Sequence, residues 1–236
     1  MSEQRIIVIN PNSSETVTSG ISAALDGLRL SGGPEIECLT LADGPPGIET
    51  QRHVDGVVDP LCRLIAANDN RAAAFVVACF SDPGLYSARE ATAKPVFGIA
   101  ESGIFAALTR GDRFGIISIL SRSIPRHLRY VRSLGVIDRL AADQAIDIGV
   151  AGLADEEKTL GRMTDVGRDL RDRHGAGVLV MGCAGMARFR QPLESALGIP
   201  VIEPTQAAAT LALGAVCLDQ AVAQAHLPGA ARGSLT

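Results

Sequence analysis

Short runs of consecutive apolar residues recur along the whole chain, without the polar alternation of a sheet that has one wet face. Strands of this kind are buried on both faces, which is typical of parallel sheets covered by helices on each side. Longer stretches of helical periodicity separate the runs, so the pattern predicts an α/β fold. The predicted strands are residues 5–10, 35–41, 73–79, 95–99, 113–118, 144–148, 177–182 and 200–203.

The two halves of the chain carry similar runs in the same order. The matching pairs are RIIVIN (5–10) with RFGIIS (113–118), FVVAC (75–79) with LVMGC (179–183), and PVFG (95–98) with PVIE (200–203). A repeated order of this kind predicts two pseudo-symmetric α/β lobes with parallel sheets flanked by helices. We expect residues 1–100 plus 206–236 to form the first lobe and residues 101–205 the second, because a helix after the last strand can return to the first lobe.

The composition indicates a small-molecule partner. The 236 residues carry a net charge of −4, no Trp, six Phe and two Tyr. They therefore offer neither the basic surface nor the stacking platform that nucleic acids need. No run reaches the roughly 18 consecutive apolar residues of a membrane helix, and MSEQRIIVIN lacks the basic and apolar parts of a secretory signal. We expect a cytoplasmic protein with no nucleic-acid and no membrane partner.

Common cofactor and metal motifs are missing from the sequence. No G-x-G-x-x-G follows a strand, no Walker loop occurs, and only two lysines are present for a Schiff base. The four histidines lack metal-ligand spacing, and the cysteines include no C-x-x-C pair. We therefore expect no metal, no cofactor and five free thiols. The cysteines are Cys38, Cys62, Cys79, Cys183 and Cys217.

Cys79 and Cys183 each lie at the carboxyl end of a predicted parallel strand. Ligand crevices of α/β proteins lie at these ends, so equivalent positions in two lobes would face each other across a cleft. The residues after each thiol could open a helix, with Asp82 as a cap and Pro83 in the first turn. We therefore expect each thiol to have a pKa lowered from about 8.5, with free N–H groups nearby to hold an enolate oxygen.

Two opposed thiols suit one reaction in particular. A thiolate removes a proton from one face of a carbon atom, and a thiol returns a proton to the opposite face, which inverts the centre. Cys38 lies within a predicted strand, whereas Cys62 and Cys217 lie in helical stretches, so we expect these three to be packing or surface residues. The sequence therefore predicts inversion by two cysteine bases, that is, racemisation.

Further polar residues follow the predicted strands. Asn10 ends the first strand, and we expect it to point into the same crevice, where its carboxamide could donate to and accept from a ring amide. Ser121 has the matching place in the second half, and Thr205 follows the last strand. For Ser121 and Thr205, a role as a helix cap and a role in binding both remain open.

The segments INPNSSETVT, ACFSDPGL, PVFGIAE and VLVMGCAGM resemble the Asp/Glu/hydantoin racemase superfamily, and within it the hydantoin and allantoin racemase branch. The resemblance runs in order from about residue 5 to about residue 205. It implies two flavodoxin-like lobes with the active site in the cleft between them, a homo-oligomer, and cofactor-independent racemisation through Cys79 and Cys183. It also implies a set of substrate-binding residues: Asn10, Pro11, Phe80, Ser81, Ser121, Ala184 and Gly185.

Differences from the amino-acid racemases of the superfamily favour a hydantoin substrate. Those enzymes usually have Asn-Thr after the first cysteine and Thr-His after the second, where this chain has Phe80-Ser81 and Ala184-Gly185. The C5 hydrogen of a hydantoin lies beside a neutral carbonyl, so its removal needs fewer helping groups. Cys79 argues against the arylmalonate decarboxylase branch, which keeps only the second cysteine. The hydantoin branch usually has Gly at the position of Ser81.

The resemblance thus implies an isomerase that racemises 5-substituted hydantoins, allantoin included, as its small-molecule substrates. An aspartate or glutamate racemase, or a maleate-type isomerase, of the same superfamily is the alternative enzyme. A non-catalytic protein that binds a small cyclic amide in the same cleft, with both thiols protonated, is the alternative outside catalysis.

Overall fold

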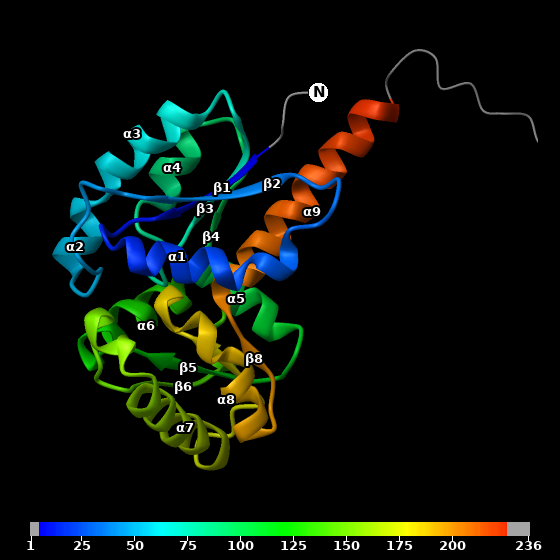
Figure 1. The fold of residues 1–236 in the computed structure, drawn as a ribbon. Coiled ribbons are helices and arrows are strands. Elements are labelled where there is room, and N and C mark those ends of the chain that lie inside the picture. Colours follow the sequence, from blue (N-terminus) through cyan, green and yellow to red (C-terminus); the bar gives the residue numbers. More distant parts are fainter. Residues whose placement is uncertain (1–4, 226–236) are drawn as a thin grey trace, which may run out of the picture.

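The residues that the structure describes form two parallel sheets, each at the centre of one lobe (Figure 1). This computed structural model describes residues 5–225, with 220–225 described by their backbone alone. The strands are β1 (Arg5–Asn10), β2 (Glu35–Thr40), β3 (Ala72–Val77), β4 (Val96–Gly98), β5 (Phe114–Ser118), β6 (Leu140–Ala145), β7 (Val178–Met181) and β8 (Val201–Ile202). The α-helices are α1 (Glu15–Ala24), α2 (Gln51–Gly56), α3 (Val58–Asn68), α4 (Leu85–Ala91), α5 (Ile99–Leu108), α6 (Ile124–Ser133), α7 (Glu156–Asp172), α8 (Arg190–Leu197) and α9 (Pro204–Ala225). Short 3-10 helices are η1 (Asp26–Leu28), η2 (Ser121–Ser123), η3 (Ile137–Arg139), η4 (Val150–Ala154) and η5 (Ala184–Phe189).

The two sheets share one topology. The strand order is β2-β1-β3-β4 in the first and β6-β5-β7-β8 in the second, and all pairs are parallel. In each lobe the order reverses beside the first strand, which is the point where open α/β sheets hold a crevice at the carboxyl ends of their strands. The predicted α/β fold of two pseudo-symmetric lobes, with helices flanking parallel sheets, is confirmed.

The strand β6 lies earlier in the chain than the predicted strand at 144–148. It spans Leu140–Ala145, and all six of its side chains are only partly buried, because β6 is an edge strand beside β5. Its sequence LAADQA therefore has no continuous apolar run to reveal it. The apolar pair Ile146 and Ile148, which suggested the later position, follows the strand and continues to donate backbone hydrogen bonds to Ser118 O and Ile119 O. The other predicted strands occur at the expected places.

Side chains that alternate along β1 divide the core of the first lobe into two layers. Ile6 and Val8 point to one face of the sheet, where they pack in one cluster with residues of α1 and α9. Ile7 and Ile9 point to the other face and pack with residues of α2, α3 and α4. All four side chains are fully buried. Helices therefore cover both faces, as a continuous apolar strand requires.

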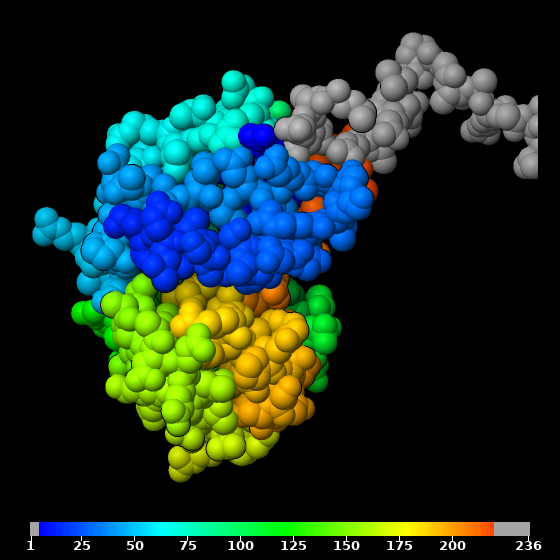
Figure 2. Space-filling model, in the orientation of Figure 1, coloured from blue at the N-terminus to red at the C-terminus, as the bar shows by residue number. Residues whose placement is uncertain are grey.

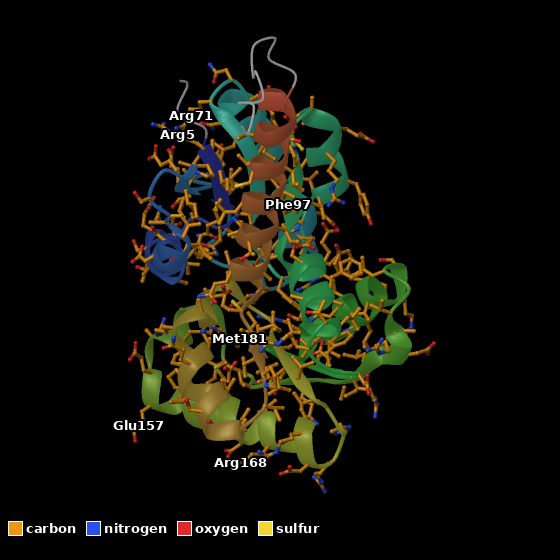
Figure 3. All side chains as sticks on the ribbon, turned by 90° about the vertical axis from the view of Figure 1, so that its right-hand side faces the viewer. Arg5, Arg71, Phe97, Glu157, Arg168 and Met181 are labelled. Atoms are coloured by element: carbon orange, nitrogen blue, oxygen red, sulfur yellow. The ribbon has the colours of Figure 1, made fainter. Side chains whose placement is uncertain are left out.

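The second lobe repeats this arrangement around β5 and β7. Ile117 and Met181 pack with residues of α7 and α8, and Figure 3 labels Met181 within this lobe. Ile116 and Val180 face the opposite layer, which α5 and α6 cover. Since α5 directly follows β4 of the first lobe, it forms the passage of the chain into the second lobe.

The long helix α9 returns from β8 to the first lobe. It packs against β1, β3 and β4, and it lies along α5 at the junction (Figures 1 and 3). Ala208, Ala209 and Ala212 are fully buried on its inner face, where small side chains let the helix approach the sheet. The lobe boundaries that we predicted stay a prediction, and residues 1–4 and 226–236 of the predicted first lobe lie outside the described residues. No helix within residues 5–225 combines the length and apolar character needed to span a membrane.

The carboxylate of Asp82 ties the loop after β3 to both neighbouring helices. It accepts hydrogen bonds from the backbone N–H of Ala100 (2.8 Å) and Glu101 (2.9 Å) in the first turn of α5, and from the Tyr130 hydroxyl (2.8 Å) of α6. Burial raises the pKa of Asp82 to about 7 although these three donors favour the ionised form. The expectation that Asp82 caps the helix after its own loop is wrong, because its side chain turns to the N-terminus of α5 instead, and Gly84 precedes α4.

Replacing Gly98 by alanine is expected to destabilise the protein. A Cβ atom at Gly98 would lie 2.3 Å from the Asp82 carboxylate, so the substitution displaces the Asp82 side chain that holds the loop. Overpacking of this kind costs about 1–3 kcal/mol, and in a chain of this size each kcal/mol lowers the melting temperature by roughly 2–4 °C. Thermal unfolding followed by circular dichroism measures the change. Gly161→Ala in α7, where a Cβ meets nothing within 4 Å, is the matched control and should not lower the melting temperature; equal melting temperatures for the two variants would contradict the expectation.

Candidate active site

A small cavity lies between the lobes at the carboxyl ends of β3 and β7. Its walls include Cys79 and Ser81 from the first lobe and Cys183 and Gly185 from the second. Its volume of about 30 Å³ is the space of roughly one water molecule. The lobes are closed upon each other here: α1 contacts η5, and Figure 2 shows blue atoms of the first lobe directly against yellow atoms of the second.

Cys79 is half-buried and follows β3 by two residues. Burial raises the pKa of its thiol to about 12, because the protein replaces the water that would solvate a thiolate. The backbone N–H of Ser81 and the nearby Arg126 guanidinium act in the opposite direction and favour the thiolate, but they only partly offset burial. The neighbouring thiol of Cys183 raises the pKa further, so the two sulfur atoms interact electrostatically across the cavity.

Cys183 has the equivalent position after β7, where it is the residue before η5. It is half-buried, and burial raises the pKa of its thiol to about 11, although the backbone N–H of Gly185 donates to the sulfur. Glu203 and Glu49 contribute to this increase through their negative charge. The expectation of lowered thiol pKa values is therefore wrong in direction. The loop after Cys79 makes turns rather than a helix, and the loss of water outweighs the N–H donors at both thiols.

The cavity brings together six of the nine residues that the sequence proposed for the site. These are Cys79, Phe80, Ser81, Cys183, Ala184 and Gly185. Asn10, Pro11 and Ser121 are not among its lining residues. The Ser121 hydroxyl instead donates to the Asp147 carboxylate at 2.8 Å. The Pro11 carbonyl oxygen packs against Gly44, since a Cβ atom added to Gly44 would lie only 2.4 Å from it. The roles of all nine residues toward a substrate stay predictions.

Asn10 supports the cavity wall from behind. Its amide nitrogen donates to Asn12 Oδ1 and to Thr18 Oγ1, both at 3.0 Å, and its Oδ1 accepts from the Asn12 backbone N–H at 3.2 Å. Because these bonds use the carboxamide at both ends, Asn10 holds Asn12 in place, and Asn12 is the residue of this loop that lines the cavity. Asn10 is 1% exposed.

Two further residues that line the cavity, Arg126 and His127, come from α6 and were not singled out in the sequence. His127 Nδ1 lies 2.9 Å from Asp143 Oδ2 and 3.0 Å from Ser118 Oγ, and its ring stands edge-on to Phe80 with centroids 5.3 Å apart. The carboxylate of Asp143 fixes the orientation of the imidazole ring. His127 and the buried Val131 are spaced i, i+4 and therefore share the inner face of an amphipathic helix. This spacing is the sequence signal from which burial of His127 could have been predicted.

A larger pocket of about 720 Å³ adjoins this cavity. Val17, Val150 and Gly185 line both spaces and so form the partition between them. Glu49 of the first lobe joins this boundary to the second lobe, because its carboxylate accepts from the Val150 backbone N–H at 3.2 Å and from Arg122 Nη2 at 2.5 Å.

The fold and this cavity define a two-lobed α/β protein whose candidate site lies where the lobes meet. The chain belongs to the Asp/Glu/hydantoin racemase family, because the family model matches residues 6–212. The resemblance stated from the motifs is thereby confirmed, and the chain is an isomerase of the racemase type that acts on a small molecule.

Individual relatives agree with this assignment. The chain is 34% identical over 226 residues to hydantoin racemase of Paenarthrobacter aurescens, with 94% of this chain and 95% of that protein covered. The structure of allantoin racemase from Klebsiella pneumoniae matches with a TM-score of 0.84 and 33% identity, over 92% of this chain and 89% of that one. A glutamate racemase from Bacillus anthracis, 16% identical, shares the fold with a TM-score of 0.67, over 96% of this chain and 84% of its own.

Proposed function

We propose that the protein racemises 5-substituted hydantoins, allantoin included, by a cofactor-independent two-base mechanism. One observation carries the proposal: Cys79 and Cys183 occupy equivalent positions after β3 and β7, in lobes of the same topology, and line one cavity between them. The names of the hydantoin and allantoin racemases that the chain resembles support the substrate class.

The proposed reaction removes the proton of the ring carbon C5 from one face and delivers a proton to the opposite face. A cysteine thiolate takes the C5 proton and becomes a thiol, and the electron pair of the broken C–H bond enters the C4 carbonyl as an enolate. The opposite cysteine thiol then gives its proton to the other face of C5 and becomes a thiolate. Because the starting thiolate and thiol have exchanged places, the enzyme is ready for the mirror-image substrate, and reaction in both directions needs no other reagent.

The cavity suits a neutral ring better than a free amino acid. Phe80 and Ala184, the residues directly after the two cysteines, have apolar side chains that are about 4% exposed. They offer no donor or acceptor to an ammonium or carboxylate group on the reacting carbon. A hydantoin ring instead presents its carbonyl and N–H groups, which can bind backbone groups and polar atoms of the wall.

The closed cavity of about 30 Å³ is too small for a hydantoin ring. The proposal therefore includes an opening step in which the contact of Glu49 with Val150 and Arg122 breaks, and the partition moves aside. Closure around the ring then removes water from the thiols. A relatively dry site keeps a thiolate reactive and excludes water as a competing proton donor.

Racemisation of a single enantiomer in heavy water tests the proposed function. One enantiomer of 5-isobutylhydantoin, and separately one of allantoin, is incubated with the protein in D2O with a metal chelator and no added cofactor. We expect loss of optical rotation together with incorporation of deuterium at C5, measured by polarimetry and proton NMR, at rates well above a protein-free sample.

The same experiment separates the alternatives. Aspartate, glutamate and maleate are run in parallel: turnover of one of these with inert hydantoins would replace the proposal by the amino-acid racemase or the maleate-type isomerase. Saturable binding of a hydantoin by calorimetry without any exchange at C5 would favour the non-catalytic binding protein. The homo-oligomer and the cytoplasmic location expected from the sequence belong to this proposal, and sedimentation of the purified protein measures the first.

A further inference from the structure

Arg126 is a cation in the cavity wall, and among the side chains that the structure describes no carboxylate forms an ion pair with it. Its Nε donates to Ser81 Oγ at 2.9 Å and its Nη2 donates to Ser123 Oγ at 3.3 Å. No salt bridge joins it to a carboxylate of the residues whose side chains the structure describes, and Nη1 has no hydrogen-bond partner among them. Arg122, in contrast, pairs with the Glu49 carboxylate.

This arrangement has an energetic cost that a ligand could offset. A half-buried guanidinium has lost part of its water, and burial accordingly lowers the pKa of Arg126. Hydroxyl groups return only part of the lost solvation, whereas a carboxylate would return more through a charge-assisted, two-point hydrogen bond. Apart from Arg126, the lining residues include no arginine, lysine, aspartate or glutamate. The cavity is therefore matched to an anion rather than to a cation.

The position of Arg126 places this charge beside one reacting group. Ser81, which holds Nε, follows Cys79 by two residues, and the positive charge of Arg126 is close enough to Cys79 to favour its thiolate. Under the proposed function the ring carbon lies between the two thiols, so a guanidinium at the Cys79 wall is placed near that carbon and near groups that project from it. The Ser81 hydroxyl fixes the orientation of the planar Arg126 guanidinium. This accounts for a serine at a position where the hydantoin racemase branch usually has glycine.

We propose that Arg126, oriented by Ser81 and Ser123, binds a carboxylate on the C5 substituent, so that the preferred substrates are hydantoins derived from acidic amino acids. The inference rests on the proposed function and names its substrate class. It makes Arg126 a specificity-determining residue. The competing role for Arg126 is to stabilise the Cys79 thiolate alone, which would help every hydantoin equally.

Paired substrates separate these two roles. Hydantoin-5-acetate carries the carboxylate, and hydantoin-5-acetamide has nearly the same shape without the charge. We expect the wild-type protein to have a kcat/KM for the acid at least about tenfold above that for the amide. Arg126→Gln should lower kcat/KM for the acid by at least about 30-fold, mainly through KM, because one member of a desolvated charge pair is lost. For the amide kcat/KM should fall by a clearly smaller factor, because this substrate loses only the effect of the Arg126 charge on the Cys79 thiolate.

Two other variants complete the design. Arg126→Lys keeps the charge but loses the planar fork, so it should recover part of the activity on the acid. Arg132→Gln, which removes an exposed cation from the same helix, is the matched control and should leave both substrates unchanged within about twofold. Thermal unfolding of each variant shows that loss of activity does not come from loss of folding.

Several results would overturn the inference. Equal losses on acid and amide in Arg126→Gln, with a changed pH profile, would assign Arg126 to the Cys79 thiolate. A wild-type protein that racemises the amide as well as the acid would show that no anion site exists. If neither hydantoin is racemised, the proposed function fails first; calorimetric titration of hydantoin-5-acetate into wild type and Arg126→Gln then still decides whether Arg126 binds a carboxylate.

Discussion

Replacing Cys79 or Cys183 by serine is expected to lower the rate of racemisation by about 10²–10⁴-fold, the usual contribution of a positioned acid or base. A serine hydroxyl is far less acidic than a thiol, so it cannot act as the base at accessible pH. Each single variant keeps one thiol and should therefore still remove the C5 proton from one face only. Incubation of each pure enantiomer in D2O measures this: Cys79→Ser should exchange one mirror form, and Cys183→Ser the other.

The remaining cysteines provide the controls for this experiment. Cys62→Ser in α3 and Cys217→Ser on the exposed face of α9 change a thiol far from the cavity and should keep full activity. Exchange of both enantiomers at wild-type rates by Cys79→Ser would contradict the two-base mechanism, and so would loss of exchange for both enantiomers in a variant that is folded. The first result would exclude Cys79 as a base, and the second would assign both proton transfers to one residue.

The value of kcat/KM is expected to rise with pH from pH 7, by about tenfold for each pH unit, until the imide N–H of the hydantoin ring itself begins to ionise. Burial raises the pKa of Cys79 to about 12 and that of Cys183 to about 11, so only a small fraction of molecules carries a thiolate at neutral pH. Raising the pH increases this fraction. Since the second thiol must stay protonated to deliver its proton, ionisation of both thiols would also lower the rate, but only at a pH above that at which the substrate ionises.

Hydantoins racemise in alkaline solution without protein, so the protein-free rate at each pH must be subtracted. Cys79→Ser run in parallel supplies a folded protein with one base removed, and circular dichroism at each pH shows that the chain remains folded. A profile that levels off near pH 8 would contradict the raised pKa values. It would instead support thiols of nearly ordinary acidity, as expected where N–H donors and the charge of Arg126 dominate over burial.

The fold could be predicted largely from local sequence. Fully buried parallel strands such as β1 and β7 need continuous apolar residues, and this requirement leaves a visible run. The edge strand β6 has no such requirement, because within residues 5–225 it pairs with a strand on one edge alone and its side chains are partly exposed. Its position was therefore misplaced onto Ile146 and Ile148, which are buried beside the strand end rather than within it.

The site could be predicted only in part. Cys79 and Cys183 were identifiable because the end of a parallel strand is a fixed place in the fold. The direction of their pKa shifts was not, because it depends on how completely the closed lobes exclude water, and no short motif encodes that. Arg126 and His127 reach the cavity from a helix that follows a different strand, so only the packing of α6 against the loop after β3 brings them there.

The carboxylate of Asp82 joins elements that belong to different lobes, since it binds α5 and the Tyr130 hydroxyl from a loop that also carries Cys79. Under the proposed mechanism, the distance between the Cys79 and Cys183 thiols is therefore set by how the two lobes are positioned relative to each other, and not by the mobility of one loop. A compound wedged into the seam would slow the conversion of both mirror forms to the same degree, whereas one that blocks a single sulfur would bias the handedness of exchange.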